Sequence, residues 1–227
     1  MNHRIFVLPL AVFALVPTAF ADPDPATSFR PRFEAMQEIC LKRDYAKLSH
    51  EIVSPKTEFW DYSMSEAQDV GGRAMMKVFQ EPVLWVRSVA RRKNGMSQAE
   101  KDLAEMTTAI ENFAEKEKLG KWERACLSKC VTAHMIAYTD TREANFLLQP
   151  ARIAEKGIGV CKQYAMLGEY LSNTLGVKAY TMSDGTSKTE DGSKIPYAGH
   201  VYNKITIDGI SYYSEPQDDR CVFMNLH

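Results

Sequence analysis

Five cysteines, an odd number, constrain the fold of this chain more than any other feature. They are Cys40, Cys126, Cys130, Cys161 and Cys221 in a sequence of 227 residues. If the chain is exported to a compartment where disulfides persist, four of these cysteines can pair and one is left over. The cysteines therefore have to be interpreted together with the N-terminus.

The first 21 residues have the pattern of a signal peptide. Arg4 precedes an almost wholly apolar stretch at residues 5–16, and the small residues Ala19 and Ala21 come just before a polar segment. The stretch is short for a membrane span, and small residues at these positions suit signal peptidase. We expect cleavage after Ala21 and a periplasmic or secreted protein without stable membrane insertion; an uncleaved anchor is the alternative.

In an exported chain, helix geometry limits which cysteines can pair. Cys126 and Cys130 are four residues apart in a segment that we predict to be helical, where Cβ atoms lie about 5–6 Å apart. A disulfide requires about 3.5–4.5 Å. These two cysteines should therefore not bond to each other, and one arrangement pairs each of them with Cys40 or Cys221 and leaves Cys161 free. Sequence alone does not fix the connectivity.

Composition and charge exclude several classes of protein. Hydrophobic residues make up 45% of the chain and charged residues 25%, which is typical of a globular protein and excludes disorder, collagen and coiled coil. Lys and Arg total 28 against 29 Asp and Glu, so the net charge is −1. No basic excess points to nucleic acid or to an anionic membrane as the main partner.

The first half of the chain is rich in helix-forming residues, and we predict an all-helical N-terminal region over residues 22–95. Ser97 followed by Glu100 forms a capping box that begins a further helix. The domain that follows, residues 96–227, either packs against the helical region or is separated from it by an unmarked boundary near residue 95. The other helices that we predict cover residues 33–48, 66–92 and 121–138.

After Pro150 the pattern becomes mixed, so the predicted fold class is α+β. A helix over residues 161–175 ends at Gly176, a strand covers residues 177–182, and a flexible loop covers residues 183–194. Strands at residues 200–207 and 210–215 form a hairpin around Asp208-Gly209.

Cys161 has the position of a nucleophile. At the start of a helix its thiol is close to the positive end of the helix dipole, and free backbone N–H groups there can hold an oxyanion. Gly159 lets the chain turn tightly and leaves room for a substrate. The alternative is a buried or disulfide-bonded cysteine at a helix start.

The hairpin supplies a base and an acid for that thiol. A two-residue turn at Asp208-Gly209 places Tyr202 opposite Glu215, and His200 is on the same face as Tyr202. Diagonal neighbours across a strand pair are about 7–8 Å apart, so the Glu215 carboxylate can reach and orient the His200 imidazole. Asp218 and Asp219 are weaker candidates for the acid.

Other candidate ligands have simpler interpretations. His134 lies on a predicted helix without metal-ligand spacing, so we expect a hydrogen-bonded packing residue and no metal site. We expect no cofactor. Calcium is the alternative, and its candidate ligands are scattered loop acids that we expect to be solvated: Asp184, Asp191, Asp218 and Asp219.

The chain contains three segments, in this order: Gly159-Val160-Cys161-Lys162-Gln163-Tyr164-Ala165, Leu175-Gly176-Val177-Lys178-Ala179 and Gly199-His200-Val201-Tyr202-Asn203-Lys204-Ile205. Together they resemble the transglutaminase-like superfamily, whose catalytic triad is a Cys, a His and an acid before Pro, and the acid corresponds to Glu215, which precedes Pro216. The resemblance covers about residues 125–220. Two departures are Glu215 where the family usually has Asp, and Tyr202 where it often has Trp.

The resemblance implies a papain-like core, with a helix bearing Cys161 packed on an antiparallel sheet bearing His200 and Glu215. It implies a cysteine protease or deamidase that acts on peptide or protein amides through a thioester. Gly159, Tyr164 and Tyr202 are candidates for substrate or oxyanion contacts. A cross-linking transglutaminase, which transfers the acyl group to a lysine amine, and a non-catalytic binding module on the same fold are the alternatives.

Overall fold

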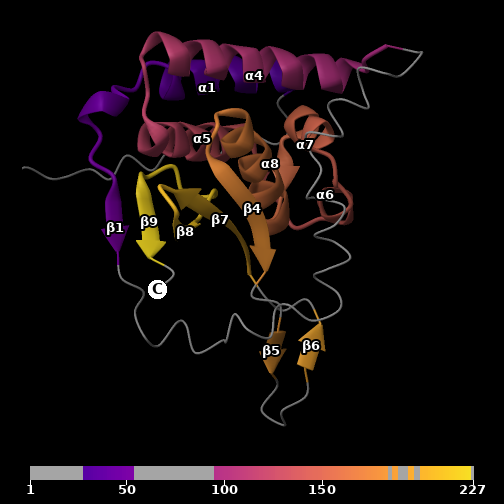
Figure 1. Cartoon of the computed structure of the whole chain (residues 1–227). Coiled ribbons are helices and arrows are strands. Elements are labelled where there is room, and N and C mark those ends of the chain that lie inside the picture. The colour runs from indigo at the N-terminus through magenta and orange to yellow at the C-terminus, as the bar shows by residue number, and fades with distance from the viewer. Residues whose placement is uncertain (1–27, 54–94, 184–185, 189–193, 197–199, 226–227) are drawn as a thin grey trace, which may run out of the picture.

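The computed structural model describes residues 28–53, 95–183, 186–188, 194–196 and 200–225, and they form a mixed α+β fold (Figure 1). The helices are α1 (Phe29–Cys40), the 3-10 turn η1 (Tyr45–Lys47), α4 (Gln98–Lys116), α5 (Lys121–Met135), α6 (Arg142–Asn145), α7 (Pro150–Lys156) and α8 (Cys161–Thr174). The strands are β1 (Glu51–Val53), β2 (Ala137–Tyr138), β3 (Ile158–Gly159), β4 (Lys178–Ser183), β5 (Thr186–Lys188), β6 (Lys194–Pro196), β7 (Val201–Ile207), β8 (Ile210–Ser214) and β9 (Val222–Asn225).

The main sheet has the strand order β1-β9-β8-β7-β4. β1 runs parallel to β9, and the other neighbours are antiparallel. In the β7–β8 hairpin Asn203 pairs with Ser214, which is the predicted register. Asp208 and Gly209 have φ values of 51° and 85°, the left-handed conformation that a tight hairpin turn requires at both central positions.

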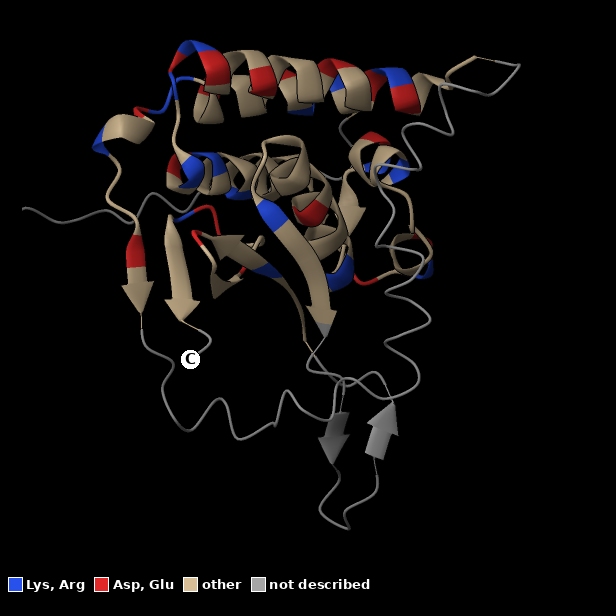
Figure 2. Ribbon diagram, viewed as in Figure 1, with Lys and Arg blue, Asp and Glu red and all other residues tan. Residues whose placement is uncertain are grey.

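Two layers of helices lie above the sheet in the view of Figure 1. α5 and α8 are next to the sheet, and α8 contacts both β4 and β7. α1 and α4 lie beyond them, with α1 against α5. Charged residues are frequent along the outer helix α4 (Figure 2), whereas α8 contributes fully buried Leu167 and Leu171 to the core. α8 also binds β4 through a polar group, since Glu169 Oε2 accepts the Thr181 N–H at 2.7 Å.

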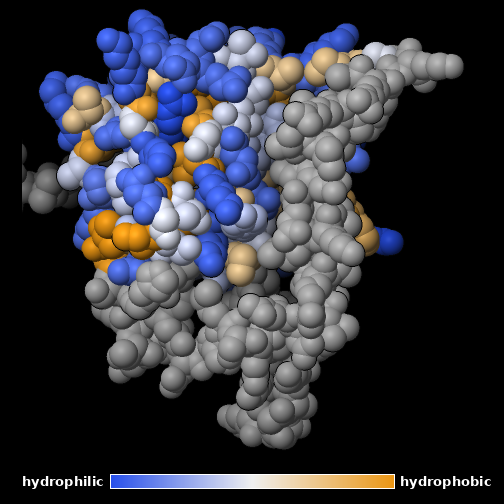
Figure 3. Space-filling view, viewed as in Figure 1, coloured by the Kyte–Doolittle hydropathy of each residue, from blue (hydrophilic) through white to orange (hydrophobic). Residues whose placement is uncertain are grey.

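The surface in view matches this layering. Hydrophilic side chains cover α4, and an apolar patch lies over β1 and β9 (Figure 3). Among the residues that the structure describes, no helix combines the length and the apolar character needed to cross a membrane.

The prediction of an all-helical region over residues 22–95 is wrong for its described part. Glu51–Val53 is the edge strand β1, and it pairs with Val222–Met224 near the other end of the chain. Because that partner is distant in sequence, no local pattern indicates the strand. The predicted helix over residues 33–48 is α1 followed by the turn η1. The predicted signal peptide and the helix over residues 66–92 lie outside the described residues.

Two boundaries in the second half also differ from the prediction. The helix predicted over residues 121–138 ends at Met135, because Ala137 and Tyr138 pair with Ile158 and Gly159 as the parallel strands β2 and β3. Within the predicted loop at residues 183–194, Thr186–Lys188 forms strand β5, which pairs with β6. The capping box is confirmed, since the Glu100 N–H donates to Ser97 Oγ at 3.3 Å and the Ser97 N–H donates to Glu100 Oε2 at 2.7 Å.

Two disulfides join α5 to distant parts of the chain. Cys130 bonds to Cys40 at the end of α1, and Cys126 bonds to Cys221 just before β9, with Cα–Cα distances of 5.8 and 5.0 Å. The prediction that Cys126 and Cys130 do not bond to each other is confirmed. Cys161 is free, so the odd cysteine is the one at the start of α8.

Candidate active site

Cys161 is the first residue of α8. The buried side chain of Gln163, in the first turn, holds this helix start in place. Gln163 accepts the Val160 N–H at 3.1 Å through Oε1 and donates to the Leu147 carbonyl at 3.0 Å through Nε2. A Cβ on Gly159 would lie 2.4 Å from Gln163 Cβ. Only glycine therefore fits at position 159, and the expectation that this residue lets the chain turn tightly into the helix has a steric basis.

The strand that follows His200 is tied to the same helix. Asn203 Nδ2 donates to the Ala165 carbonyl of α8 at 2.8 Å. Gly168 makes the close approach of α8 and β7 possible, because a Cβ there would lie 2.5 Å from Asn203 Oδ1. His200, just before β7, is thereby held near the N-terminal end of α8.

Glu215 lies directly after β8 and contacts His200. Its Oε2 hydrogen-bonds with His200 Nε2 and also accepts the Tyr213 hydroxyl at 2.8 Å, while its Oε1 accepts the Gln217 N–H at 3.3 Å. The predicted juxtaposition of His200 and Glu215 is present. Because Nε2 contacts Glu215, Nδ1 is the ring nitrogen that is left for a second partner.

The Cys161 thiol also interacts with the His200 side chain. Burial raises the pKa of the thiol, but the bond to His200 and backbone N–H bonds from Val201 and Lys162 outweigh burial, so the pKa is lowered. The hydrogen bonds of His200 with Cys161 and Glu215 raise its pKa to about 10. These opposite shifts favour a thiolate–imidazolium pair.

Tyr164 and Tyr202, two of the candidates for substrate contacts, are buried. The Tyr164 hydroxyl donates to the Ile136 carbonyl at 2.6 Å. The Tyr202 ring packs against Tyr213 with 4.5 Å between ring centroids. Each side chain is 3% exposed, so both act in packing, and the expectation that they touch substrate is corrected.

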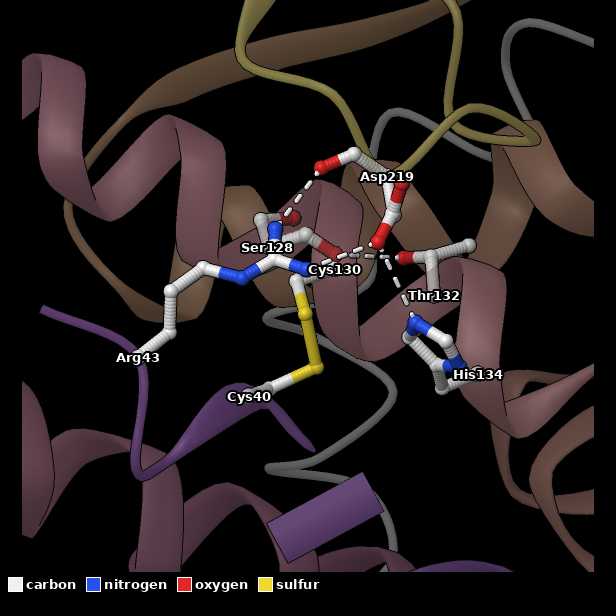
Figure 4. Close-up of a disulfide and its surroundings, with 7 residues drawn as sticks. All are labelled: Cys40, Arg43, Ser128, Cys130, Thr132, His134 and Asp219. Carbon is white, nitrogen blue, oxygen red and sulfur yellow. Dashed lines mark hydrogen bonds and ion pairs between the residues drawn. A yellow bond between two sulfur atoms is a disulfide. The ribbon is translucent and has the colours of Figure 1, made fainter. Parts of the chain in front are cut away.

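The two alternative acids have other partners. Asp219 accepts Arg43 Nη2 at 2.8 Å and pairs with His134 Nε2 at 3.3 Å, beside the Cys40–Cys130 disulfide (Figure 4). Asp218 binds Arg220. His134 is thus hydrogen-bonded, as expected. Its ring lies within 4.8 Å of the Cys40 and Cys130 sulfurs, but these two sulfurs are bonded to each other.

Of the acids named as calcium candidates, Asp184 and Asp191 lie outside the described residues. The two that are described, Asp218 and Asp219, make the ion pairs given above.

Sequence reasoning missed a buried lysine behind the acid. Lys129 on α5 is 3% exposed. It donates to the Val222 carbonyl at 2.8 Å and lies 5.0 Å from the centroid of the Phe223 ring. Burial lowers its pKa to about 8, although the charges of Asp218 and Glu215 act in the opposite direction. In the sequence, the one sign that Lys129 is buried is its position between Cys126 and Cys130.

Tyr213 is a second residue that sequence reasoning missed. It is two residues before Glu215 in β8, so the alternation of a strand places it on the same face as the acid. That spacing could have indicated a hydrogen-bond donor to Glu215.

Comparison with known proteins finds a distant structural similarity. No family model matches the chain, and no curated protein matches it. The chain is similar to a solved structure described as a "putative cysteine protease" from Cytophaga hutchinsonii, with 16% sequence identity and a TM-score of 0.36. The similarity covers 49% of this chain and 38% of that one, so it spans well under half the length of the other protein.

Proposed function

We propose that this protein is an exported cysteine hydrolase that cleaves peptide or protein amides, as a protease or deamidase of the transglutaminase-like type. The observation that carries the proposal is that His200 hydrogen-bonds with the carboxylate of Glu215 and also interacts with the free thiol of Cys161. A nucleophile, a base and a group that orients the base are the parts that thiol catalysis requires.

In the first half of the reaction, the Cys161 thiolate attacks the amide carbonyl carbon and forms a C–S bond. The backbone N–H of Cys161, at the positive end of α8, is the donor that we assign to the oxyanion. The His200 imidazolium gives its proton to the amide nitrogen, the C–N bond breaks, and ammonia or an amine leaves. The acyl group is then held as a thioester on Cys161.

In the second half, neutral His200 takes a proton from water, and the resulting hydroxide attacks the thioester carbon. The thiolate leaves, the carboxylic acid forms, and the imidazolium is restored. Glu215 keeps the ring in place and stabilises its positive charge in both halves.

Hydrolysis, rather than transfer to an amine, is favoured by the exposure of the site. The His200 side chain is 39% exposed and the Glu215 side chain 24% exposed, so water reaches the position from which the thioester is attacked. A cross-linking enzyme would have to exclude that water while admitting an amine.

The other elements of the proposal concern the fold and the location. A helix bearing Cys161, packed against the β7–β8 hairpin that carries His200 and Glu215, is compatible with a papain-like core. The signal-peptide pattern and the two disulfides support export. A non-catalytic module is less consistent with Cys161 being free.

The test is mass spectrometry of a peptide mixture incubated with the protein, with and without a primary amine. Backbone cleavage or deamidation of glutamine is expected in both conditions, and the Cys161→Ala variant should give neither product. Incorporation of the amine would favour a transglutaminase. Undiminished turnover by the Cys161→Ala variant would rule out the proposed mechanism.

A further inference from the structure

Exposed apolar side chains are concentrated in one short segment before α8. Among the described residues, the large hydrophobic side chains with substantial exposure include Tyr138, Phe146 and Leu148, at 55%, 71% and 47%. These three lie within eleven residues of one another. Large exposed apolar side chains that lie together on a surface commonly mark a binding site.

This segment is anchored to the residues around Cys161. Tyr138 pairs with Gly159 in the β2–β3 ladder. Lys162 Nζ donates to the Asn145 carbonyl at 2.9 Å, and Gln163 Nε2 donates to the Leu147 carbonyl at 3.0 Å. The two residues that follow Cys161 therefore hold the main chain on both sides of Phe146.

The Phe146 ring is also supported from its own helix. The Arg142 guanidinium lies 6.0 Å from the ring centroid, a cation–π geometry that orients the ring. An aromatic ring that is oriented but largely uncovered offers apolar area at a small further cost in conformational entropy.

Its position relative to the triad indicates which half of a substrate it would meet. In the thioester the acyl half stays on the Cys161 sulfur, and the segment lies against the start of α8, which carries that sulfur. The amine leaves on the side of His200, which protonates it and belongs to the β7–β8 hairpin. The segment is thus on the acyl side.

We propose that Tyr138, Phe146 and Leu148 bind an apolar or aromatic side chain on the acyl side of the scissile amide. This proposal rests on the proposed function and adds a substrate class to it: peptides with bulky apolar residues at or just before the cleaved bond. An apolar contact of this kind distinguishes an apolar side chain from glycine by roughly tenfold or more.

The test measures how fast Cys161 is alkylated by three electrophiles, followed by intact-protein mass spectrometry. They are iodoacetamide, acetyl-Phe-Phe chloromethyl ketone and acetyl-Gly-Gly chloromethyl ketone. The thiolate displaces iodide or chloride and forms a C–S bond in each case. We expect the wild-type protein to react at least about tenfold faster with the Phe-Phe reagent than with the Gly-Gly reagent.

Three variants test whether Phe146 and Leu148 cause the preference for the Phe-Phe reagent. Phe146→Ser and Leu148→Ser should each lower the Phe-Phe to Gly-Gly rate ratio several-fold, whereas Phe146→Leu should keep most of it. Ile210→Ser is the matched control, because Ile210 is also exposed but lies beside the hairpin turn, at the end of β7–β8 away from His200. Iodoacetamide rates should be unchanged in all four.

A rate ratio near one in the wild-type protein, or a ratio that Phe146→Ser and Ile210→Ser change equally, would overturn this inference. Failure of the proposed function looks different. In that case iodoacetamide would alkylate Cys161 at the same rate in the wild-type protein and in a His200→Ala variant, whatever the ratio of the two ketones.

Discussion

Glu215 Oε2 hydrogen-bonds with both His200 Nε2 and the Tyr213 hydroxyl, which lies 2.8 Å away. The acid is therefore fixed from two sides: Tyr213 is in β8 itself, and the Gln217 N–H holds the other carboxylate oxygen. Glutamate is one methylene longer than aspartate. The longer side chain is held in a defined orientation and still reaches the ring.

The first prediction concerns this acid. Glu215→Gln should lower kcat/KM by about 10²–10⁴-fold, because the amide cannot stabilise the imidazolium. Tyr213→Phe removes one hydrogen bond to the same oxygen and should cost less, about tenfold or below. Steady-state kinetics on a peptide that the wild-type protein cleaves would check both. Equal losses in the two variants would contradict the assigned roles.

The second prediction concerns the close approach of α8 to β7. A Cβ on Gly168 would lie 2.5 Å from Asn203 Oδ1 and 3.0 Å from Pro216 Cβ, so Gly168→Ala forces the strand and the acid loop away from the helix. We expect a loss of about 1–3 kcal/mol in the free energy of unfolding and a reduced kcat. Urea unfolding and kinetics would measure these effects. Gly209→Asn, at the hairpin turn, should leave kcat unchanged.

The third prediction concerns the disulfides, which close separations of 90 and 95 residues. Replacing both cysteines of either bridge with serine should lower the free energy of unfolding by about 2–5 kcal/mol. The Cys126/Cys221 variant should also lose activity, because Cys221 follows the acid loop. Denaturant unfolding with and without a reductant would test this. The reductant should lower the free energy of unfolding less in each double variant than in the wild-type protein, because only one bridge is left to reduce.

The fourth prediction concerns Lys129, whose pKa is lowered to about 8 by burial. The ordinary pKa of lysine is 10.5, so between pH 8 and 10.5 the unfolded chain binds more protons than the folded one. Stability contributed by this group therefore rises with pH across that window. The comparison to make is urea unfolding of the wild-type protein and Lys129→Met at pH 8 and pH 10. The wild-type protein should gain stability relative to the variant; equal pH dependence would exclude a buried lysine that titrates there.

Local sequence patterns predict the parts of the site that depend on short-range geometry. The Asp208-Gly209 turn fixes the β7–β8 register and so brings Glu215 to His200. Helix geometry alone excludes a Cys126–Cys130 bond. Ser97 and Glu100 locate the start of α4 for the same reason, since a capping box is complete within four residues.

What the sequence did not indicate depends on contacts between distant segments. β1 is a strand only because it pairs with β9, and residues 137–138 leave the predicted helix only because they pair with residues 158–159. Lys129 resembles a surface residue until β9 covers it. The burial of Tyr164 and Tyr202 likewise arises from the packing of α8 against the sheet, so their expected substrate contacts could not be checked from the motif.

The pH dependence of Cys161 alkylation by iodoacetamide is the direct test of whether His200 makes Cys161 a thiolate. The thiol pKa is lowered below its ordinary 9.0 and the His200 pKa is raised to about 10. The ion pair therefore exists above the lowered thiol pKa and is lost as pH rises through about 10. We predict alkylation that begins below pH 9.0 in the wild-type protein, and a shift of the profile to higher pH in His200→Gln. Coincident profiles for the two proteins would show that His200 does not lower the pKa of the Cys161 thiol.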